Sequence, residues 1–190
     1  GCWLLIALPT AAYLHAPAKY LVPSAPAAAL LVERLRRPGE STLSTGIAWA
    51  TVGAGAALGL AITMADAEFS GVGRQAAREL IAPRVRAGER VWFAGGWGSE
   101  WYALRAGAVP LAHQPPFPAP GDIVVKSDAT PGPKLDVSGL DSLDGRTYTS
   151  RFGRTMAAEQ GAGFYSNRWG VLPWTWTNAP IEHLTVWRVR

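Results

Sequence analysis

Two carboxylates, Asp66 and Glu68, form a close acidic pair that is a candidate for a functional site. They directly follow an uncharged apolar segment, so a carboxylate there can face a site at a membrane surface. The alternative is that they begin a solvated helix, where negative charge interacts favourably with the helix dipole. The spacing of Asp141 and Asp144 is typical of turn residues.

The common catalytic and metal-binding motifs are absent from the sequence. It contains no GxSxG elbow, no HExxH pair, no P-loop and no CxxC motif. The single cysteine, Cys2, excludes an internal disulfide framework and a cysteine-based zinc site, and the three histidines are widely separated. The sequence therefore predicts no metal site and no bound cofactor.

Tryptophan is unusually frequent, with nine residues, and three of them cluster near the C-terminus as Trp169, Trp174 and Trp176. Their rings can form a platform that stacks on a sugar or a lipid headgroup. They can also anchor the chain at a membrane interface, where tryptophan is enriched. The third interpretation is that these large rings fill the small core of a loop-rich domain.

The charged residues divide the 190-residue chain into an apolar part, 1–65, and a globular part, 66–190. Only six charged residues lie in the first part, and those of the second are nearly balanced in sign. The formal net charge is +4, with no run of Lys and Arg suited to following a nucleic-acid backbone. Nucleic acid is therefore not an expected partner, and the hydrophobic share of 48% argues against intrinsic disorder.

Three apolar segments, at 3–14, 20–32 and 46–65, predict two to three transmembrane helices. The last contains twenty residues without charge or proline. At about 1.5 Å per residue, such a helix spans the roughly 30 Å hydrocarbon core. The alternatives are a buried helix of a soluble protein for 46–65 and a signal peptide for 3–14. The chain begins with glycine inside an apolar run, which favours a processed chain or a piece of a longer protein.

The orientation in the membrane follows from three arginines, Arg34, Arg36 and Arg37, which lie between two apolar segments. Short loops rich in Lys and Arg remain in the cytoplasm. This placement puts residues 66–190 on the outer, extracytoplasmic side. Membrane lipid is then an expected partner of the chain.

Residues 66–190 predict a small mixed α/β domain. Apolar residues recur at helical spacing over 69–81, and Pro83 is expected to limit that helix. A buried strand at 91–94 is followed by a glycine-rich turn and a short helix with Ser99 at its N-cap and Gly107 at its end. Further strands are expected at 109–111, 123–125, 146–152 and 184–189.

The segment KYLVP at 19–23, followed by Pro26, resembles the R/K-Y-L-x-P…P segment of bacterial glycosyltransferases of the PMT/ArnT-like superfamily (family 39 and relatives, GT-C fold). Several later stretches resemble the C-terminal extracytoplasmic region of these enzymes, in the same order: VWFAGGWG at 91–98, GDIVV at 121–125, GFYS at 163–166 and LPW at 172–174. The chain departs from the family pattern at Gly96, where many relatives have histidine.

The resemblance implies a C-terminal part of an enzyme of the bacterial cytoplasmic membrane. Such enzymes move a sugar from a polyprenyl-phosphate carrier to an acceptor on the outer face, and their catalytic acid lies upstream of this chain. Lys19 would then bind the phosphate of the sugar donor, and Tyr20 would orient it. Without the resemblance, Lys19 is an interfacial lysine whose stem lies along lipid.

The alternative function is that of a membrane-anchored extracytoplasmic module without catalysis. Such a module would use the tryptophans at 169–176 to bind carbohydrate or a partner protein. The two functions differ in whether a sugar donor bound to a polyprenyl phosphate is a ligand.

The orientation is tested with a cysteine introduced at Ser138 after Cys2 has been replaced. An impermeant thiol reagent should label this cysteine in intact cells, because residues 66–190 are expected outside. Labelling that requires an opened membrane would place this part of the chain in the cytoplasm.

The same chain should resist alkaline carbonate extraction, because the uncharged segment 46–65 is expected to span the membrane. Recovery in the soluble fraction without detergent would contradict the membrane assignment.

Overall fold

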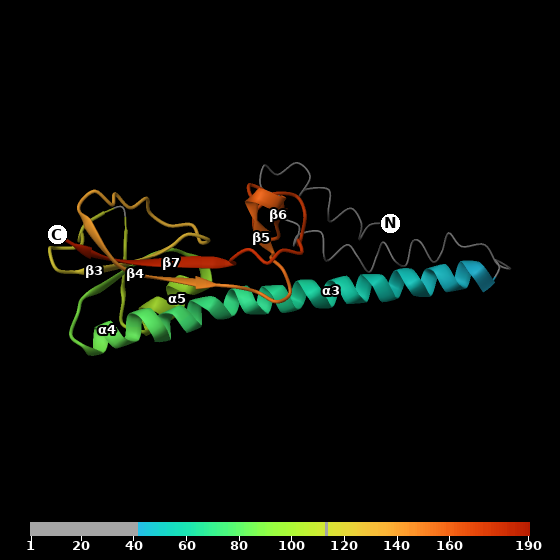
Figure 1. Ribbon diagram of the computed structural model, residues 1–190, viewed down its shortest axis with the longest axis horizontal. Helices are drawn as coiled ribbons and strands as arrows, with labels where there is room; N and C mark the ends of the chain where they lie inside the picture. Colours follow the sequence, from blue (N-terminus) through green and yellow to red (C-terminus); the bar gives the residue numbers. More distant parts are fainter. Residues whose placement is uncertain (1–41, 113) are drawn as a thin grey trace. The chain divides into compact units, whose positions relative to one another are not determined.

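The computed structural model describes residues 42–112 and 114–190 (Figure 1). The proposed donor contacts, Lys19 and Tyr20, lie outside the described residues, as do the apolar segments at 3–14 and 20–32. The chain divides into two compact units. One comprises Gly1–Ala65 with Phe152–Thr177, and the other comprises Asp66–Arg151 with Asn178–Arg190.

A long helix, α3, runs from Thr42 to Ala76 (Figure 1). It therefore continues without a break through Asp66 and Glu68, and the expectation that these residues start a helix is wrong. Nothing in the sequence ends the helix there, because no proline interrupts it and its glycines remain helical. The apolar segment and the predicted helix over 69–81 belong to one element.

Pro83 does not end the helical path, contrary to expectation. A π-helical turn, η3 (Ala77–Ile81), precedes it, and the short helix α4 (Ala82–Arg86) includes it in the first turn. Proline is tolerated at such a position, where its missing N–H group needs no partner. The guanidinium of Arg84 donates to the carbonyl oxygen of Leu80 at 2.8 Å, a side-chain contact within the same helical stretch.

Among the described residues, one helical stretch, Gly46–Arg86, is long and apolar enough to cross a membrane. Its apolar part exposes large side chains, and Trp49 is 72% exposed. The others are Ile47, Val52, Leu58, Leu60 and Met64. No described residue buries this surface, so the described part of the chain gives no support to a buried helix in a soluble protein.

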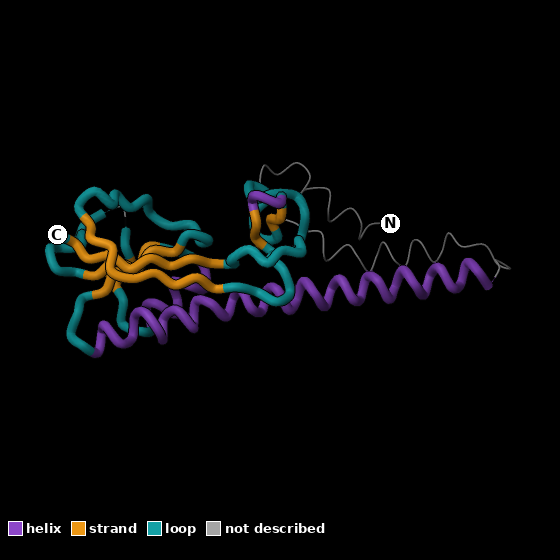
Figure 2. The backbone as a smooth tube through the Cα atoms, in the orientation of Figure 1, coloured by secondary structure: helices purple, strands orange, loops and turns teal. Residues whose placement is uncertain are grey.

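A five-stranded mixed sheet has the strand order β2-β1-β3-β7-β4 (Figure 2). β1 pairs in parallel with β2 and β3, whereas β7 pairs antiparallel with β3 and β4. The strands are β1 (Val91–Ala94), β2 (Val109–Pro110), β3 (Ile123–Ser127), β4 (Leu140–Tyr148) and β7 (Glu182–Val189). The predicted mixed α/β sheet is therefore confirmed, and it follows one long apolar helix.

The parallel pair β1–β2 is connected by helix α5 (Trp97–Arg105), which confirms the predicted β-α-β unit. The N-cap of α5 is Gly96 rather than the expected Ser99, which lies in the first turn. Gly107 has φ +98°, a left-handed conformation that glycine adopts without steric cost, and it follows the end of the helix as expected.

β4 begins earlier than the sequence suggested, and the interpretation of Asp141 and Asp144 as turn residues is wrong. Both lie in β4, with a register shift between Ser142 and Asp144 opposite β7. Most of β4 is exposed at the edge of the sheet, so its side chains show no buried alternation. Arg190 donates to the carboxylate of Asp141 at 2.7 Å.

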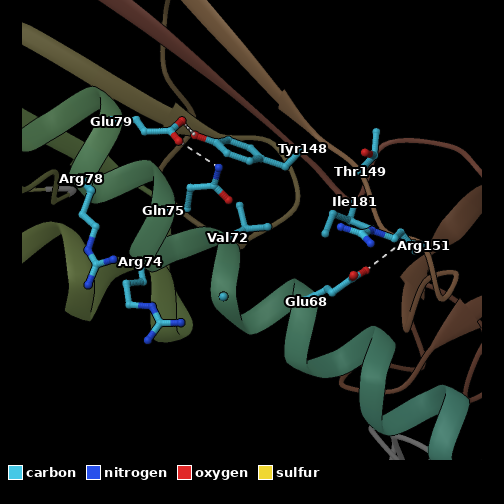
Figure 3. A pocket seen from close by; sticks show the side chains of 11 residues that line it. Glu68, Val72, Arg74, Gln75, Arg78, Glu79, Tyr148, Thr149, Arg151 and Ile181 are labelled. Carbon is cyan, nitrogen blue, oxygen red and sulfur yellow. Dashed lines mark hydrogen bonds between the residues drawn. The ribbon is translucent and has the colours of Figure 1, made fainter.

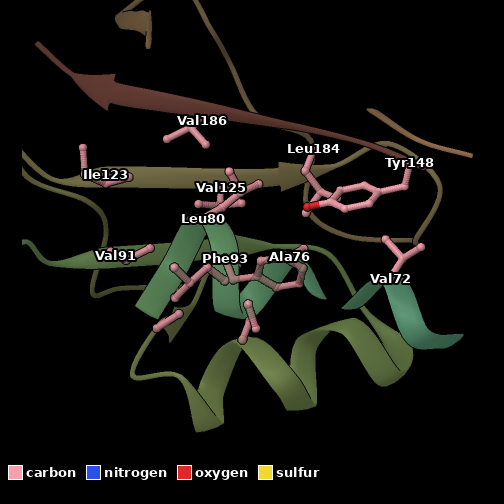
Figure 4. Close-up of a cluster of buried hydrophobic side chains, with 14 of the residues drawn as sticks. Val72, Ala76, Leu80, Val91, Phe93, Ile123, Val125, Tyr148, Leu184 and Val186 are labelled. Atoms are coloured by element: carbon pink, nitrogen blue, oxygen red, sulfur yellow. The ribbon is translucent and has the colours of Figure 1, made fainter. Parts of the chain in front are cut away.

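The main core lies between one face of the sheet and the helices (Figure 4). The end of α3 and η3 contribute Val72, Ala76 and Leu80, which are buried against strand residues such as Phe93 and Val125. A smaller cluster around Trp92 and Val124 covers the opposite face. The last turns of α3 belong to this core, so the compact unit that holds the sheet needs them in order to fold.

Residues 152–177 form a small loop-rich region of their own. It contains the two-stranded sheet of β5 (Met156–Ala157) and β6 (Ala162–Gly163), joined by the 3-10 turn η4 (Ala158–Gln160). Arg154 is nearly buried and forms an ion pair with Glu159. The ion pair and the hydrogen bonds of the short hairpin both stabilise this region.

Two glycines of α3 provide a matched test of how α5 packs on it. A Cβ atom at Gly73 would lie 2.8 Å from the Cα atom of Ser99 in α5, whereas one at Gly71 would meet nothing within 4 Å. We expect Gly71→Ala to stabilise the fold by about 0.5–1 kcal/mol through helix propensity. Gly73→Ala should destabilise it by about 1–3 kcal/mol through overpacking. Thermal unfolding followed by tryptophan fluorescence would check the opposite signs, and equal effects would contradict the close contact.

Candidate functional site

A cavity of about 600 Å³ lies between the last turns of α3 and the end of β4 (Figure 3). All its lining residues belong to the unit that holds the sheet. The charged and polar ones are Glu68, Arg74, Gln75, Arg78, Glu79, Tyr148, Thr149 and Arg151. The cavity thus combines three guanidinium groups with two carboxylates.

Glu79 is fully engaged within the cavity wall. Its carboxylate accepts hydrogen bonds from the hydroxyl of Tyr148 at 3.2 Å and from the side-chain amide of Gln75 at 2.9 Å (Figure 3). A guanidinium nitrogen of Arg146 lies 3.6 Å from the same carboxylate. Burial, together with the negative charge of Glu79, raises the pKa of Tyr148 above its usual value, so this hydroxyl stays protonated at physiological pH.

Of the predicted acidic pair, only Glu68 lines the cavity. Its carboxylate accepts the backbone N–H of Arg151 at 2.9 Å, a contact that joins α3 to the segment after β4. Asp66 and Glu68 are two positions apart on one helix, and such positions point in different directions. The structure therefore does not bring the two carboxylates together as an acid–base pair.

The three cavity arginines, Arg74, Arg78 and Arg151, are exposed and take part in none of the ion pairs between described residues. Arg74 in the last turn of α3 and Arg78 in η3 are one helical turn apart and extend from the same side of the helical stretch (Figure 3). Because both cavity carboxylates are engaged, the guanidinium groups remain available. Guanidinium groups bind phosphate and carboxylate in a forked geometry, so the cavity is suited to an anion.

A second polar cluster supports the carboxyl ends of β1 and β3. Glu182 is 3% exposed, and its Oε2 accepts the hydroxyl of Ser127 at 2.6 Å. Its Oε1 accepts three backbone N–H groups, those of Asp128, Ala129 and His183, at 2.9–3.1 Å. Burial raises the pKa of Glu182 above its usual value, although these hydrogen bonds oppose the shift.

The cluster continues to the glycine-rich turn after β1. Ser127 accepts hydrogen bonds from Thr130, and the Thr130 hydroxyl accepts the backbone N–H of Gly96 at 3.1 Å. A Cβ atom at Gly96 would lie 2.5 Å from the carbonyl oxygen of Pro131. The crevice between strand ends, where α/β proteins commonly bind ligands, is therefore closed here by backbone contact.

A side chain at position 96 would therefore require the segment at Pro131 to move away.

The three clustered tryptophans lie in the 152–177 region, which belongs to the other unit. Trp169 and Trp174 are half-buried, and the indole N–H of Trp174 donates to the carbonyl oxygen of Phe152 at 2.7 Å. Trp176 is 65% exposed, with its ring 5.8 Å from that of Trp174 in an edge-on arrangement. Trp169 and Trp174 are thus partly covered, whereas the ring of Trp176 is accessible.

Sequence reasoning missed the cavity arginines and Tyr148. Arg74 and Arg78 lie off the apolar face of the helix expected over 69–81, and Arg151 lies in the strand expected at 146–152. No sequence pattern therefore links the three arginines. A one-turn spacing of two arginines immediately after an apolar segment was the available signal. Within residues 42–112 and 114–190, no group of three or more His, Cys, Asp or Glu side chains could hold a metal ion.

Comparisons with family models, curated proteins and solved structures found no match to the chain.

The raised pKa of Glu182 predicts a pH-dependent effect of Glu182→Gln, a neutral variant of the same shape. A carboxyl whose folded pKa is raised contributes stability that is full below the unfolded value of about 4.5 and is lost as the pH rises through the folded pKa. Relative to wild type, Glu182→Gln should therefore become more stable as the pH rises from 4 to 8. Thermal unfolding across this range would measure the difference.

Glu182→Ala is the control, because it leaves three backbone N–H groups and the Ser127 hydroxyl without their acceptor. Because both variants lack the carboxyl, we expect Glu182→Ala to be less stable than Glu182→Gln by about 1–3 kcal/mol at every pH. A pH-independent difference between wild type and Glu182→Gln would show that Glu182 titrates normally in the folded protein.

Proposed function

We propose that this chain is part of a bacterial membrane glycosyltransferase that moves a sugar from a polyprenyl-phosphate carrier to an acceptor on the outer membrane face. The proposal includes a multi-pass membrane part, of which 1–65 is the end, and an extracytoplasmic domain that begins at residue 66. It is supported by the resemblance of KYLVP at 19–23 and of VWFAGGWG at 91–98 to such enzymes. In this proposal the catalytic acid lies outside the chain.

The observation that carries the proposal is the position of the arginine-lined cavity on α3. The cavity begins at Glu68, three residues after the uncharged segment that ends at Ala65. Three residues of helix correspond to about 4.5 Å. An anion held by these guanidinium groups is therefore near the surface of a bilayer crossed by α3, where the phosphate of a lipid-linked sugar is found.

Lys19 and Tyr20 belong to the same proposal. The ammonium group of Lys19 would contact the carrier phosphate, and Tyr20 would orient it. The positive-inside orientation of the loop with Arg34, Arg36 and Arg37 supports one shared outer face for Lys19 and the cavity. On that face, Lys19 and Arg151 can act on one substrate.

A second candidate is a membrane-anchored extracytoplasmic module that binds carbohydrate or a partner without catalysis. The exposed ring of Trp176 beside Trp174 favours it, because an accessible indole ring can stack on a sugar. This candidate needs no polyprenyl-phosphate donor. Donor kinetics therefore separate the two.

Lys19→Ala and Arg151→Gln in the intact enzyme should each lower kcat/KM for the polyprenyl-phosphate sugar donor by about 10- to 150-fold. This range corresponds to the loss of one hydrogen bond to a charged group, about 1.5–3 kcal/mol. Matched controls are Lys134→Ala and Arg168→Gln, whose exposed side chains form no ion pair between described residues. Radiolabelled sugar transfer is the measurement.

Unchanged donor kinetics in a well-folded Lys19→Ala variant would make Lys19 an interfacial lysine, and the same result for Arg151→Gln would remove the cavity from the donor site. The isolated chain supplies the baseline, because it is expected to transfer no sugar. Transfer by the isolated chain would contradict the placement of the catalytic acid upstream.

A further inference from the structure

Helix α5 exposes a stripe of large apolar side chains. Trp97 is 43% exposed, Trp101 53% and Leu104 40%. Their spacing of four and three residues places them on one face of the helix. The opposite face packs on the sheet through the buried Ala103. Large apolar side chains exposed on one face of a helix, as Trp101 and Leu104 are, are typical of a helix that lies at a membrane interface.

A hollow of about 400 Å³ lies beside this stripe, between α3 and α5. Ser70 and Arg74 of α3 line it together with Trp101 and Tyr102 of α5. The contact of Gly73 with Ser99 sets the close approach of the two helices at this point. The hollow thus offers a hydroxyl, a guanidinium group and an aromatic ring to one ligand.

Arg74 is the one charged residue that lines the hollow, and Arg105 adds a second positive charge beside the aromatic wall. The guanidinium of Arg105 lies 4.9 Å from the ring centroid of Trp101, a cation–π arrangement that holds both side chains. Neither Arg74 nor Arg105 takes part in an ion pair between described residues. Both charges are available to an anion.

The first α3 residues that line the hollow, Ala67 and Ser70, lie at the depth of phospholipid headgroups, and Arg74 lies beyond it, so its long side chain must extend back toward that layer. The α3 residues of the hollow, Ala67 to Arg74, lie two to nine positions after Ala65. At 1.5 Å per residue they are about 3–14 Å beyond the end of the uncharged segment. The headgroup layer occupies roughly 5–8 Å on each side of the hydrocarbon core.

We propose that α5 lies on the leaflet from which α3 emerges and that the hollow binds the headgroup of an anionic phospholipid. Arg74 and Arg105 bind the phosphate, Trp101 lies at the headgroup level, and Leu104 contacts the acyl boundary. The site rests on the crossing of the bilayer by α3, and it goes beyond the glycosyltransferase proposal because it needs no sugar carrier. The exposed rings and leucine of α5, beside two arginines that form no ion pair between described residues, favour an anionic lipid over a second protein as the occupant.

The depth of α5 is tested by quenching in vesicles that contain spin-labelled phosphatidylcholine. Three single-cysteine variants of the full chain carry a fluorophore in a Cys2→Ser background, at Leu104→Cys, Ala57→Cys and Ser138→Cys. Lipids labelled near the headgroup should quench position 104 at least about threefold more than position 138. Lipids labelled deep in the acyl chain should quench position 57, which verifies the crossing of α3 separately.

Equal quenching at 104 and 138 with strong quenching at 57 would overturn the interfacial position of α5 and leave the crossing intact. Such a result would indicate that another protein surface covers the stripe. Absence of quenching at 57 would overturn the proposal at its premise.

Headgroup recognition is tested by native mass spectrometry of the full chain with phosphatidylglycerol and phosphatidylcholine at equal concentration. Wild type should retain phosphatidylglycerol at least about fivefold more than phosphatidylcholine, and Arg74→Gln should abolish this preference. Arg86→Gln is the matched control, since Arg86 is exposed at the end of α4 outside the hollow. Equal loss in both variants would reduce the effect to general charge and overturn the site.

Inorganic phosphate distinguishes the source of the anion. It should not displace phosphatidylglycerol at millimolar concentration, because the stripe at Trp101 and Leu104 contributes to lipid binding alone. Displacement by inorganic phosphate with the same effect on wild type and Trp101→Ala would identify a site for free anions and overturn the lipid assignment.

Discussion

The structure depends on one helix, α3, whose two parts suit different environments: lipid for the first part and the protein core for the last turns. Its first part exposes residues such as Trp49 and Leu60, which are stable in lipid and unfavourable in water. Its last turns bury Val72 and Ala76 against the sheet, where they form the core with η3. The change occurs within about two turns around Asp66, with no break in the helix. The fold of the sheet domain is therefore linked to the segment suited to the membrane.

This constraint determines where chemistry is available. The cavity arginines and the hollow at Trp101 both use α3 residues that directly follow the apolar segment. In contrast, the crevice between the ends of β1 and β3 is closed by the contact of Gly96 with Pro131. The network from Glu182 through Thr130 holds that closure. Available binding groups therefore gather along the helix rather than at the strand ends.

The elements that form locally were predictable from the sequence, and those that depend on distant pairing were not. Runs such as VWFA at 91–94 are apolar on every position, because a parallel strand is covered on both faces. The first half of β4 contains aspartate, serine and glycine, which resemble a turn, and only its pairing with β7 makes it a strand. The cavity brings together residues as distant in the sequence as Glu68 and Arg151, so no local sequence pattern predicts it.

The central claim is that α3 is one continuous helix, protected by lipid in its first part and by the sheet in its last turns. Amide hydrogen exchange of the full chain in lipid bilayer discs, resolved along residues 46–82, tests it most directly, because exchange reports local opening of helical hydrogen bonds. The account predicts slow exchange throughout, with no rapidly exchanging break between Ala65 and Val72. Rapid exchange over 46–65 beside a protected 72–82 would contradict it, since the apolar part would then be neither in the bilayer nor a continuation of the core helix.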